Sequence, residues 1–389
     1  MNKIIFTFLF LIGTHYTIGA QKRFDFTLIS ENIVRDYIVS VPTGVAPAEG
    51  WPLVIMCHGT GGQGDKFYEI SKWKELGQMK NFISVFPSAL RYCIIEDSVP
   101  TITTKWNCKD IPEILCPNQN IKDDVLFISS MIDSLIKNFP NINTQKIYFS
   151  GFSNGSCFGS KLSIELNKKI AAYAGCGGFM GLEDTLQVVE PLPMWIVLGT
   201  DDPKFTVPYQ VRELPFNDSI LILLRGPIMR YLHSLGLENQ YQKIEYPNSI
   251  TYIYNTPLST IQKSEFRFTI VKGMTHQYPN GDNFPVVAAE IFYDFFDDYC
   301  RISTGIEKQD IAKITLYPNP SSNIIQCNGS EENDQIFTIT VYDLNANIIF
   351  QTQEKISKLV LEKEKIGTGL FFVELVSANR YISKKIIFK

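Results

Sequence analysis

The pentapeptide Gly151-Phe-Ser-Asn-Gly155 is the feature that most constrains the fold of this chain. The pentapeptide alone is a weak signal, but an apolar strand pattern at 146–150 leads into it and a helical pattern at 157–166 follows it. Where a strand turns sharply into a helix, the middle serine projects and the flanking glycines remove side chains that would clash. The pattern therefore predicts that Ser153 lies exposed at the end of a strand, as a candidate nucleophile.

The remaining apolar segments predict an α/β fold. Short runs of this kind are typical of parallel strands that are covered on both faces; they occupy 53–57, 82–86, 147–150, 170–175, 194–198 and 266–271, after an early strand at 35–41. Helical periodicity over 124–139 and 157–166 places helices between them. We expect a mostly parallel sheet with helices on both faces. Residues 88–120 predict a long loop.

A serine nucleophile needs a general base, and the chain has only four histidines. His15 lies in the N-terminal leader, His58 begins a glycine-rich turn, and His233 lies in a predicted helix. His276 follows the last predicted core strand, where the order Ser…Asp…His places the base. We therefore predict His276 as the base.

The acid and the oxyanion-binding groups are expected at two other strand ends. Asp201 and Asp202 both follow the strand at 194–198, and both qualify as the carboxylate that orients the base. The turn His58-Gly-Thr-Gly-Gly62 also follows a strand, and its backbone can aim an N–H group at a developing oxyanion, together with the N–H of Asn154. We expect His58 to brace this turn rather than to transfer protons.

Trp106 in the long loop, with Gln277 and Tyr278 directly after His276, are the candidates for contact with substrate, since aromatic side chains suit a sugar or phenolic group. No metal or organic cofactor is expected, because the cysteines form no C-x-x-C pair and the histidines are too few for a zinc site.

The N-terminus predicts a signal peptide over residues 1–20. Lys3 precedes an apolar run at 4–12, and the small residues Gly19 and Ala20 follow. No later run of about 18 apolar residues occurs, so no transmembrane segment is expected after its removal. Export permits disulfides, and the cysteines clustered between 93 and 116 are expected to supply at least one.

The composition of the chain changes after Asp298. We assign 21–300 to the α/β domain, 301–312 to a linker and 313–389 to a small all-β sandwich, because short alternating strands separated by turn residues fill this tail. The formal net charge of −4 shows no basic excess, so we expect no nucleic-acid partner.

Residues 25–298 resemble the α/β-hydrolase esterases that include polyhydroxybutyrate depolymerases and the feruloyl and acetylxylan esterases of the first carbohydrate esterase family. Five segments carry the resemblance, in the order of the family: 58–62, 124–127, 151–155, 199–202 and 273–279. The resemblance implies Ser153, Asp202 and His276 as catalytic residues, selects Asp202 over Asp201, and supports Thr60 as the oxyanion-loop donor. The chain departs from the family at Leu198, where a histidine is common, and at 208–264, a longer stretch that could form a lid or an altered pocket.

The tail is similar to the C-terminal sorting domain of the type IX secretion system. Tyr317-Pro-Asn-Pro320, Val341-Tyr-Asp-Leu344 and Gly369-Leu-Phe-Phe-Val373 carry this likeness. It implies the type IX machinery as a partner and release outside the cell or onto its surface. A carbohydrate-binding sandwich is the alternative.

We therefore expect a secreted serine esterase that hydrolyses feruloyl or acetyl esters on plant polysaccharide through an acyl-enzyme. The alternatives are a depolymerase of polyhydroxybutyrate-type polyester, a serine peptidase on the same fold, and a surface protein that binds without catalysis.

Overall fold

The computed structural model divides the chain into two compact units, residues 1–301 and 302–389. It describes residues 21–96, 98–108, 111–182, 188, 190–255, 264–284, 286–301, 315–328, 336–343, 347–355, 358–377 and 380–389. The predicted signal peptide at 1–20 lies outside these residues, as does the predicted linker apart from Arg301.

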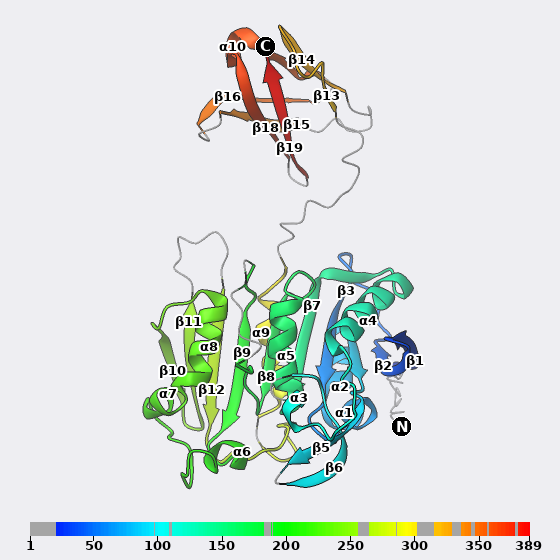
Figure 1. Cartoon of the computed structure of the whole chain (residues 1–389), viewed down its shortest axis with the longest axis vertical. Helices are drawn as coiled ribbons and strands as arrows, with labels where there is room; N and C mark the ends of the chain where they lie inside the picture. Colours follow the sequence, from blue (N-terminus) through cyan, green and yellow to red (C-terminus); the bar gives the residue numbers. More distant parts are fainter. Residues whose placement is uncertain are drawn as a thin grey trace, which may run out of the picture. The chain divides into compact units, whose positions relative to one another are not determined.

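The first unit is built on a sheet that has ten strands among the described residues, in the order β1-β2-β4-β3-β7-β8-β9-β12-β11-β10 (Figure 1). The strands are β1 Lys22–Ser30, β2 Ile33–Val41, β3 Trp51–Cys57, β4 Ile83–Pro87, β7 Ile142–Phe152, β8 Ala172–Cys176, β9 Met194–Gly199, β10 Gln242–Tyr246, β11 Ser249–Asn255 and β12 Glu265–Val271. The centre from β4 to β12 is parallel, and antiparallel pairs flank it on both sides.

Helices cover both faces of this sheet, as an α/β fold requires. One apolar core joins the sheet to α4 (Asp124–Asn138), α5 (Asn154–Glu165), α7 (Ser219–Leu223) and α8 (Arg225–Leu235). A second core on the other face joins it to α1 (Gly64–Ile70), α2 (Trp73–Lys80) and α9 (Ala288–Asp297). The α/β-hydrolase architecture with a mostly parallel sheet is thus confirmed.

Residues 88–120 do not form the long loop that we expected. They contain an antiparallel hairpin, β5 (Arg91–Glu96) with β6 (Val99–Thr104), and the short helix α3 (Ile111–Ile114). A disulfide between Cys93 and Cys116 closes this segment, as the clustering of cysteines predicted.

The described part of 208–264 belongs to the main fold rather than to a separate lid. It supplies α7 and α8 to one face and extends the sheet with the antiparallel strands β11 and β10. The residues 256–263 between β11 and β12 lie outside the described part.

The second unit is all-β. One antiparallel sheet pairs β13 (Thr315–Tyr317), β14 (Ile324–Asn328) and β17 (Val360–Glu362). The other contains β15 (Ile336–Tyr342), β16 (Ile348–Lys355), β18 (Gly369–Ser377) and β19 (Arg380–Phe388), and a turn of helix, α10 (Lys363–Ile366), follows β17. This unit has its own apolar core. Across the described residues of both units, no helix has the length and apolar character needed to cross a membrane.

A buried ion pair connects β2 to the start of α4. Asp123 caps α4 by accepting a hydrogen bond from the N–H of Leu126, while Asp124 points inward. Its carboxylate lies 2.7 Å from the Arg35 guanidinium, and the two side chains are 0% and 2% exposed. Burial raises the pKa of Asp124, and the nearby Arg35 opposes that shift.

Removing the charge of Arg35 should therefore destabilise the fold strongly. In Arg35→Met, Asp124 becomes a buried carboxylate without a counter-ion, and we expect the free energy of unfolding at pH 7 to fall by about 3–5 kcal/mol. The loss should shrink at about pH 5, because protonation of the carboxyl removes the uncompensated charge. Urea unfolding at both pH values measures this effect.

Lys146→Met is the matched control, because it breaks a more exposed pair with Asp297. We expect it to cost less than about 1 kcal/mol. Equal losses in the two variants would contradict the importance of the buried pair.

Candidate active site

Ser153 lies on a tight turn between β7 and α5, as its sequence setting predicted. Its φ of 53° and ψ of −118° are unusual for a residue with a side chain. A Cβ at Gly151 would lie 2.2 Å from the Gly155 carbonyl oxygen, and one at Gly155 would lie 2.4 Å from the oxygens of Cys57 and His58. Both glycines of the pentapeptide are thus required by close packing of the backbone.

The structure brings Ser153, His276 and Asp202 together. His276 Nε2 lies 2.8 Å from Ser153 Oγ, and its Nδ1 lies 2.8 Å from Asp202 Oδ2. The other oxygen of Asp202 accepts a hydrogen bond from the N–H of Lys204. Asp202 is 1% exposed, whereas Asp201 is exposed and accepts a hydrogen bond from the Thr200 hydroxyl.

This arrangement determines which ring nitrogen of the neutral His276 carries the proton. The carboxylate of Asp202 accepts only, so Nδ1 carries the hydrogen and Nε2 presents a lone pair to the Ser153 hydroxyl. Such a ring can take the serine proton, and the imidazolium that results lies against a buried carboxylate.

The loop that carries His276 and the loop that carries Asp202 are joined by hydrogen bonds. The N–H of Asp201 donates to the carbonyl of Met274, and the N–H of Gly273 donates to the Thr200 hydroxyl. A Cβ at Gly199 would lie 1.9 Å from the Met274 oxygen, so the two loops meet only because this residue is glycine.

The glycine turn after β3 lies beside the serine. A Cβ at Gly59 would lie 3.1 Å from Ser153 Cβ. The Gly59 carbonyl accepts hydrogen bonds from the N–H of Gly62 and from His58 Nδ1, which holds this carbonyl on the inner side of the turn. Because a trans peptide points its C=O and N–H in opposite directions, the N–H of Thr60 points away from that side.

His58 is held in one neutral form inside the protein. Its Nε2 accepts a hydrogen bond from the N–H of Ala89, so Nδ1 carries the hydrogen and donates to Gly59. The ring is fully buried, and burial lowers the pKa of His58 to about 4. These contacts make it a brace for the turn.

Asn154 is the first residue of α5, where backbone N–H groups lack a carbonyl partner within the helix. Its side chain bonds a distant segment: Oδ1 accepts from the N–H of Trp106, and Nδ2 donates to the Trp106 carbonyl. The backbone N–H at this position is suited to an oxyanion on Ser153.

The structure contradicts the expected substrate contacts of Trp106 and Tyr278. Trp106 is 0% exposed and stacks on Phe158, with ring centroids 5.0 Å apart. Tyr278 is 5% exposed, and its ring packs against those of Phe67 and Phe152. Both rings fill the interior, because each belongs to a core on one face of the sheet.

Gln277 is exposed, and its Oε1 accepts a hydrogen bond from Asn283. Its role in substrate binding stays a prediction.

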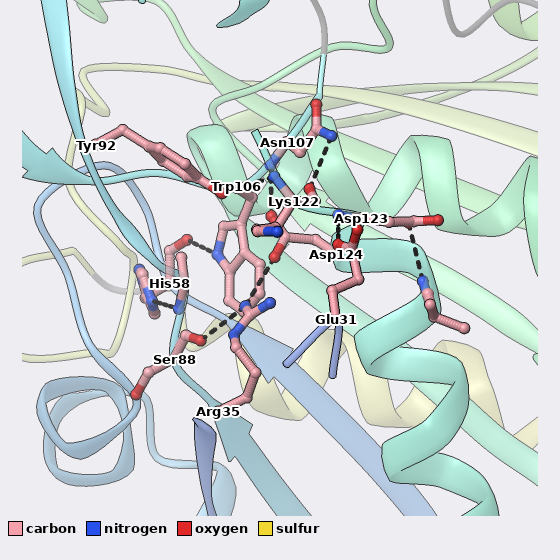
Figure 2. Close-up of polar contacts among 12 residues, drawn as sticks. Glu31, Arg35, His58, Ser88, Tyr92, Trp106, Asn107, Lys122, Asp123 and Asp124 are labelled. Carbon is pink, nitrogen blue, oxygen red and sulfur yellow. Dashed lines mark hydrogen bonds and ion pairs between the residues drawn. The ribbon is translucent and has the colours of Figure 1, made fainter. Parts of the chain in front are cut away.

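Polar residues that were not predicted from the sequence join these loops. Thr104 donates its hydroxyl to the Gly62 carbonyl, and the indole N–H of Trp106 donates to the carbonyl of His58. Figure 2 shows this indole beside His58, close to the Arg35–Asp124 pair. The β-branched residues at 99 and 101–104 favour a strand here, which would have placed Thr104 at its end.

In the part of the chain that the structure describes, no group of three or more His, Cys, Asp or Glu residues could hold a metal ion.

The low pKa of His58 predicts a pH-dependent stability. An unfolded histidine titrates near pH 6.5, so as the pH falls from about 6.5 to 4 the unfolded chain gains a proton that the folded chain resists. We expect His58 to remove about 3 kcal/mol of unfolding free energy over this interval.

Urea unfolding of the native chain and of His58→Asn at several pH values isolates this contribution. The variant should be less stable at pH 7 but should show the smaller decline below pH 6.5. Parallel declines would show that His58 is not buried in its neutral form.

Comparison with known proteins finds a match for part of each unit. Residues 45–218 match the model of the phospholipase/carboxylesterase family, and residues 315–389 match that of the secretion system C-terminal sorting domain. A curated relative, the bifunctional acetylxylan esterase/xylanase XynS20E of Neocallimastix patriciarum, is 27% identical over 168 residues, which are 43% of this chain. The match spans about a fifth (21%) of the length of that relative.

Similar solved structures include an acetyl xylan esterase from Aspergillus awamori, with 15% identity, a TM-score of 0.44, and coverage of 68% of this chain and 94% of that one. A ferulic acid esterase has 14% identity, a TM-score of 0.42, and coverage of 71% and 96%. At these TM-scores the likenesses carry no functional argument. Residues 45–218 are thus similar to the phospholipase/carboxylesterase family, and a secretion-sorting domain follows at 315–389.

Proposed function

We propose that the protein is a secreted serine esterase that works through an acyl-enzyme. The observation that carries this proposal is the continuous chain of hydrogen bonds from Ser153 through His276 to Asp202, each 2.8 Å long. Ser153 Oγ attacks the ester carbonyl carbon while His276 Nε2 takes its proton, and Asp202 stabilises the imidazolium. The tetrahedral intermediate then collapses, and the leaving alkoxide receives the proton from Nε2.

A water molecule completes the reaction by the same route. It attacks the acyl carbon while Nε2 takes a proton from it, and the serine leaves with that proton as the carboxylic acid is released. In both steps the negative charge on the carbonyl oxygen is bound by the backbone N–H groups of Thr60 and Asn154. The closeness of Gly59, which precedes Thr60, to Ser153 and the place of Asn154 at the start of α5 support this role.

The proposed substrates are feruloyl or acetyl esters on plant polysaccharide. The curated relative, a bifunctional acetylxylan esterase/xylanase, supports this class. Export supports it too, because a polymer cannot enter the cell. We assign no substrate contact to Trp106 or Tyr278, since both are buried.

A polyester of the polyhydroxybutyrate type is the second candidate, and one surface favours it. The β5–β6 hairpin borders the glycine turn, where the N–H of Gly61 donates to Thr104. Val99 and Ile102 on this hairpin are 59% and 66% exposed, which suits contact with an apolar polymer.

The sorting domain indicates export through type IX secretion. We propose that a signal peptide at 1–20 directs the first step, and that the secretion machinery then recognises the tail and delivers the esterase outside the cell or onto its surface.

Substitution of the proposed triad tests the mechanism. We expect Ser153→Ala to lower kcat on p-nitrophenyl acetate by about 10³-fold or more, because the nucleophile is lost. Asp202→Asn should cost about 10⁴-fold, since an amide favours the wrong tautomer of His276. Steady-state kinetics and labelling of Ser153 with a fluorophosphonate probe measure these effects.

Asp201→Asn is the matched control, and it should keep most of the activity. Loss at Asp201 alone would assign the acid to the wrong aspartate. An active Ser153→Ala variant would refute the mechanism.

Parallel assays on methyl ferulate, acetylated xylan and polyhydroxybutyrate test the substrate class. We expect higher kcat/KM on the ferulate or the acetylated xylan than on the polyester film. The reverse order would favour the second candidate, while cleavage of peptides in preference to esters would favour a peptidase.

A further inference from the structure

The two backbone N–H groups proposed to bind the oxyanion come from different loops. Thr60 lies in the turn after β3, and Asn154 begins α5 after β7. An oxyanion must lie 2.7–3.1 Å from each donor, so the separation of the two loops matters to the reaction. One segment, Thr104–Trp106, contacts both of them.

On the side of the glycine turn, this segment holds three peptide groups between His58 and Gln63. The Thr104 carbonyl accepts the N–H of Gly61 at 2.9 Å, and its hydroxyl donates to the Gly62 carbonyl at 2.5 Å. The indole N–H of Trp106 donates to the His58 carbonyl at 2.9 Å. These bonds fix the backbone on both sides of Thr60.

On the side of the nucleophile, the same segment is bound by one side chain. Asn154 Oδ1 accepts the N–H of Trp106 at 2.7 Å, and its Nδ2 donates to the Trp106 carbonyl at 3.2 Å. The Trp106 ring also stacks on Phe158 of α5, with planes only 2° apart. The segment is therefore bound by hydrogen bonds and ring stacking to α5, the helix that begins at Asn154.

The segment itself is anchored in the interior. The N–H of Asn107 donates to Asp124 Oδ2 at 2.7 Å, and Asp124 pairs with Arg35 (Figure 2). Thr104 and Trp106 are 6% and 0% exposed, so water does not compete for these bonds.

We propose that Thr104 and Trp106 are positioning residues that set the spacing between the Thr60 and Asn154 N–H groups. This inference rests on the proposed function, because it concerns the oxyanion of that reaction. The glycine turn has too much conformational freedom to hold Thr60 by itself, since Gly59, Gly61 and Gly62 surround it. A displacement of about 1 Å at a reacting group lowers the rate by about 10²-fold.

The first test removes one hydrogen bond and keeps the ring. Trp106→Phe loses the indole N–H that holds the His58 carbonyl, while an aromatic ring remains to stack on Phe158. Trp195→Phe is the matched control, because its indole N–H also makes one side-chain hydrogen bond, to Thr269 Oγ1 at 2.9 Å. Trp195 lies near the start of β9, whereas Asp202 follows the other end of that strand.

We expect kcat on p-nitrophenyl acetate to fall about tenfold in Trp106→Phe, with little change in KM, because the oxyanion forms only after the substrate is bound. The affinity for a trifluoromethyl ketone, which forms a tetrahedral oxyanion adduct with serine, should fall by the same factor. Trp195→Phe should change neither quantity. If Trp106 had only a structural role, Trp106→Phe would lower the fraction of folded protein, but kcat and inhibitor affinity would not fall together by the same factor.

The second test uses the hydroxyl of Thr104 and does not depend on Trp106→Phe folding. Thr104→Val keeps the shape and removes the donor to Gly62, whereas Thr104→Ser keeps the donor. We expect the valine variant to show the same loss of kcat and inhibitor affinity, and the serine variant to recover most of both.

The outcomes separate this inference from the proposed function. If Ser153→Ala stays active, the proposed function fails and the inference fails with it. If Ser153→Ala is inactive but Trp106→Phe and Thr104→Val match Trp195→Phe, the inference alone is overturned.

Discussion

The strained backbone of Ser153 is the constraint on which the arrangement of the candidate site depends. Its positive φ costs about 1–3 kcal/mol, which the surrounding contacts must offset. Its N–H donates to the Cys176 carbonyl at 2.8 Å, and its own carbonyl accepts N–H groups from the first turn of α5. Close approach of Gly155 to the end of β3 completes the turn. The serine is therefore fixed by neighbouring strands.

Parallel strands bring together groups that are far apart in the chain. Ser153 and His276 are separated by 123 positions, and His276 and Asp202 by 74, yet all three follow strands whose carboxyl ends meet at one edge of the sheet. The sheet holds the strand ends in fixed positions, and the short loops that follow the strands carry the polar side chains of the site. The same geometry brings the glycine turn, through Gly59, beside Ser153, because β3 pairs directly with β7.

The sequence predicted the parts of the site in which residue type and position along the chain restrict the choice to few candidates. A serine between glycines and four histidines were enough to select Ser153 and His276, whereas the choice of Asp202 over Asp201 came from the family resemblance. Trp106 and Tyr278 were misjudged, because the direction of an aromatic side chain in an irregular segment depends on tertiary packing. The edge strand β1 and the hairpin β5–β6 were missed for a similar reason, since exposed strands lack the continuous apolar runs of the sheet centre.

The disulfide between Cys93 and Cys116 has a consequence for where the chain can mature. It closes a stretch of 23 positions that contains Thr104 and Trp106. Closing a loop of this length disfavours the unfolded chain by about 3 kcal/mol, and such bonds persist only in oxidising compartments. The segment that contacts both the glycine turn and the start of α5 is thus held more firmly once the protein has left the cytoplasm. Redox conditions along the export route would in this way couple maturation of the enzyme to its delivery.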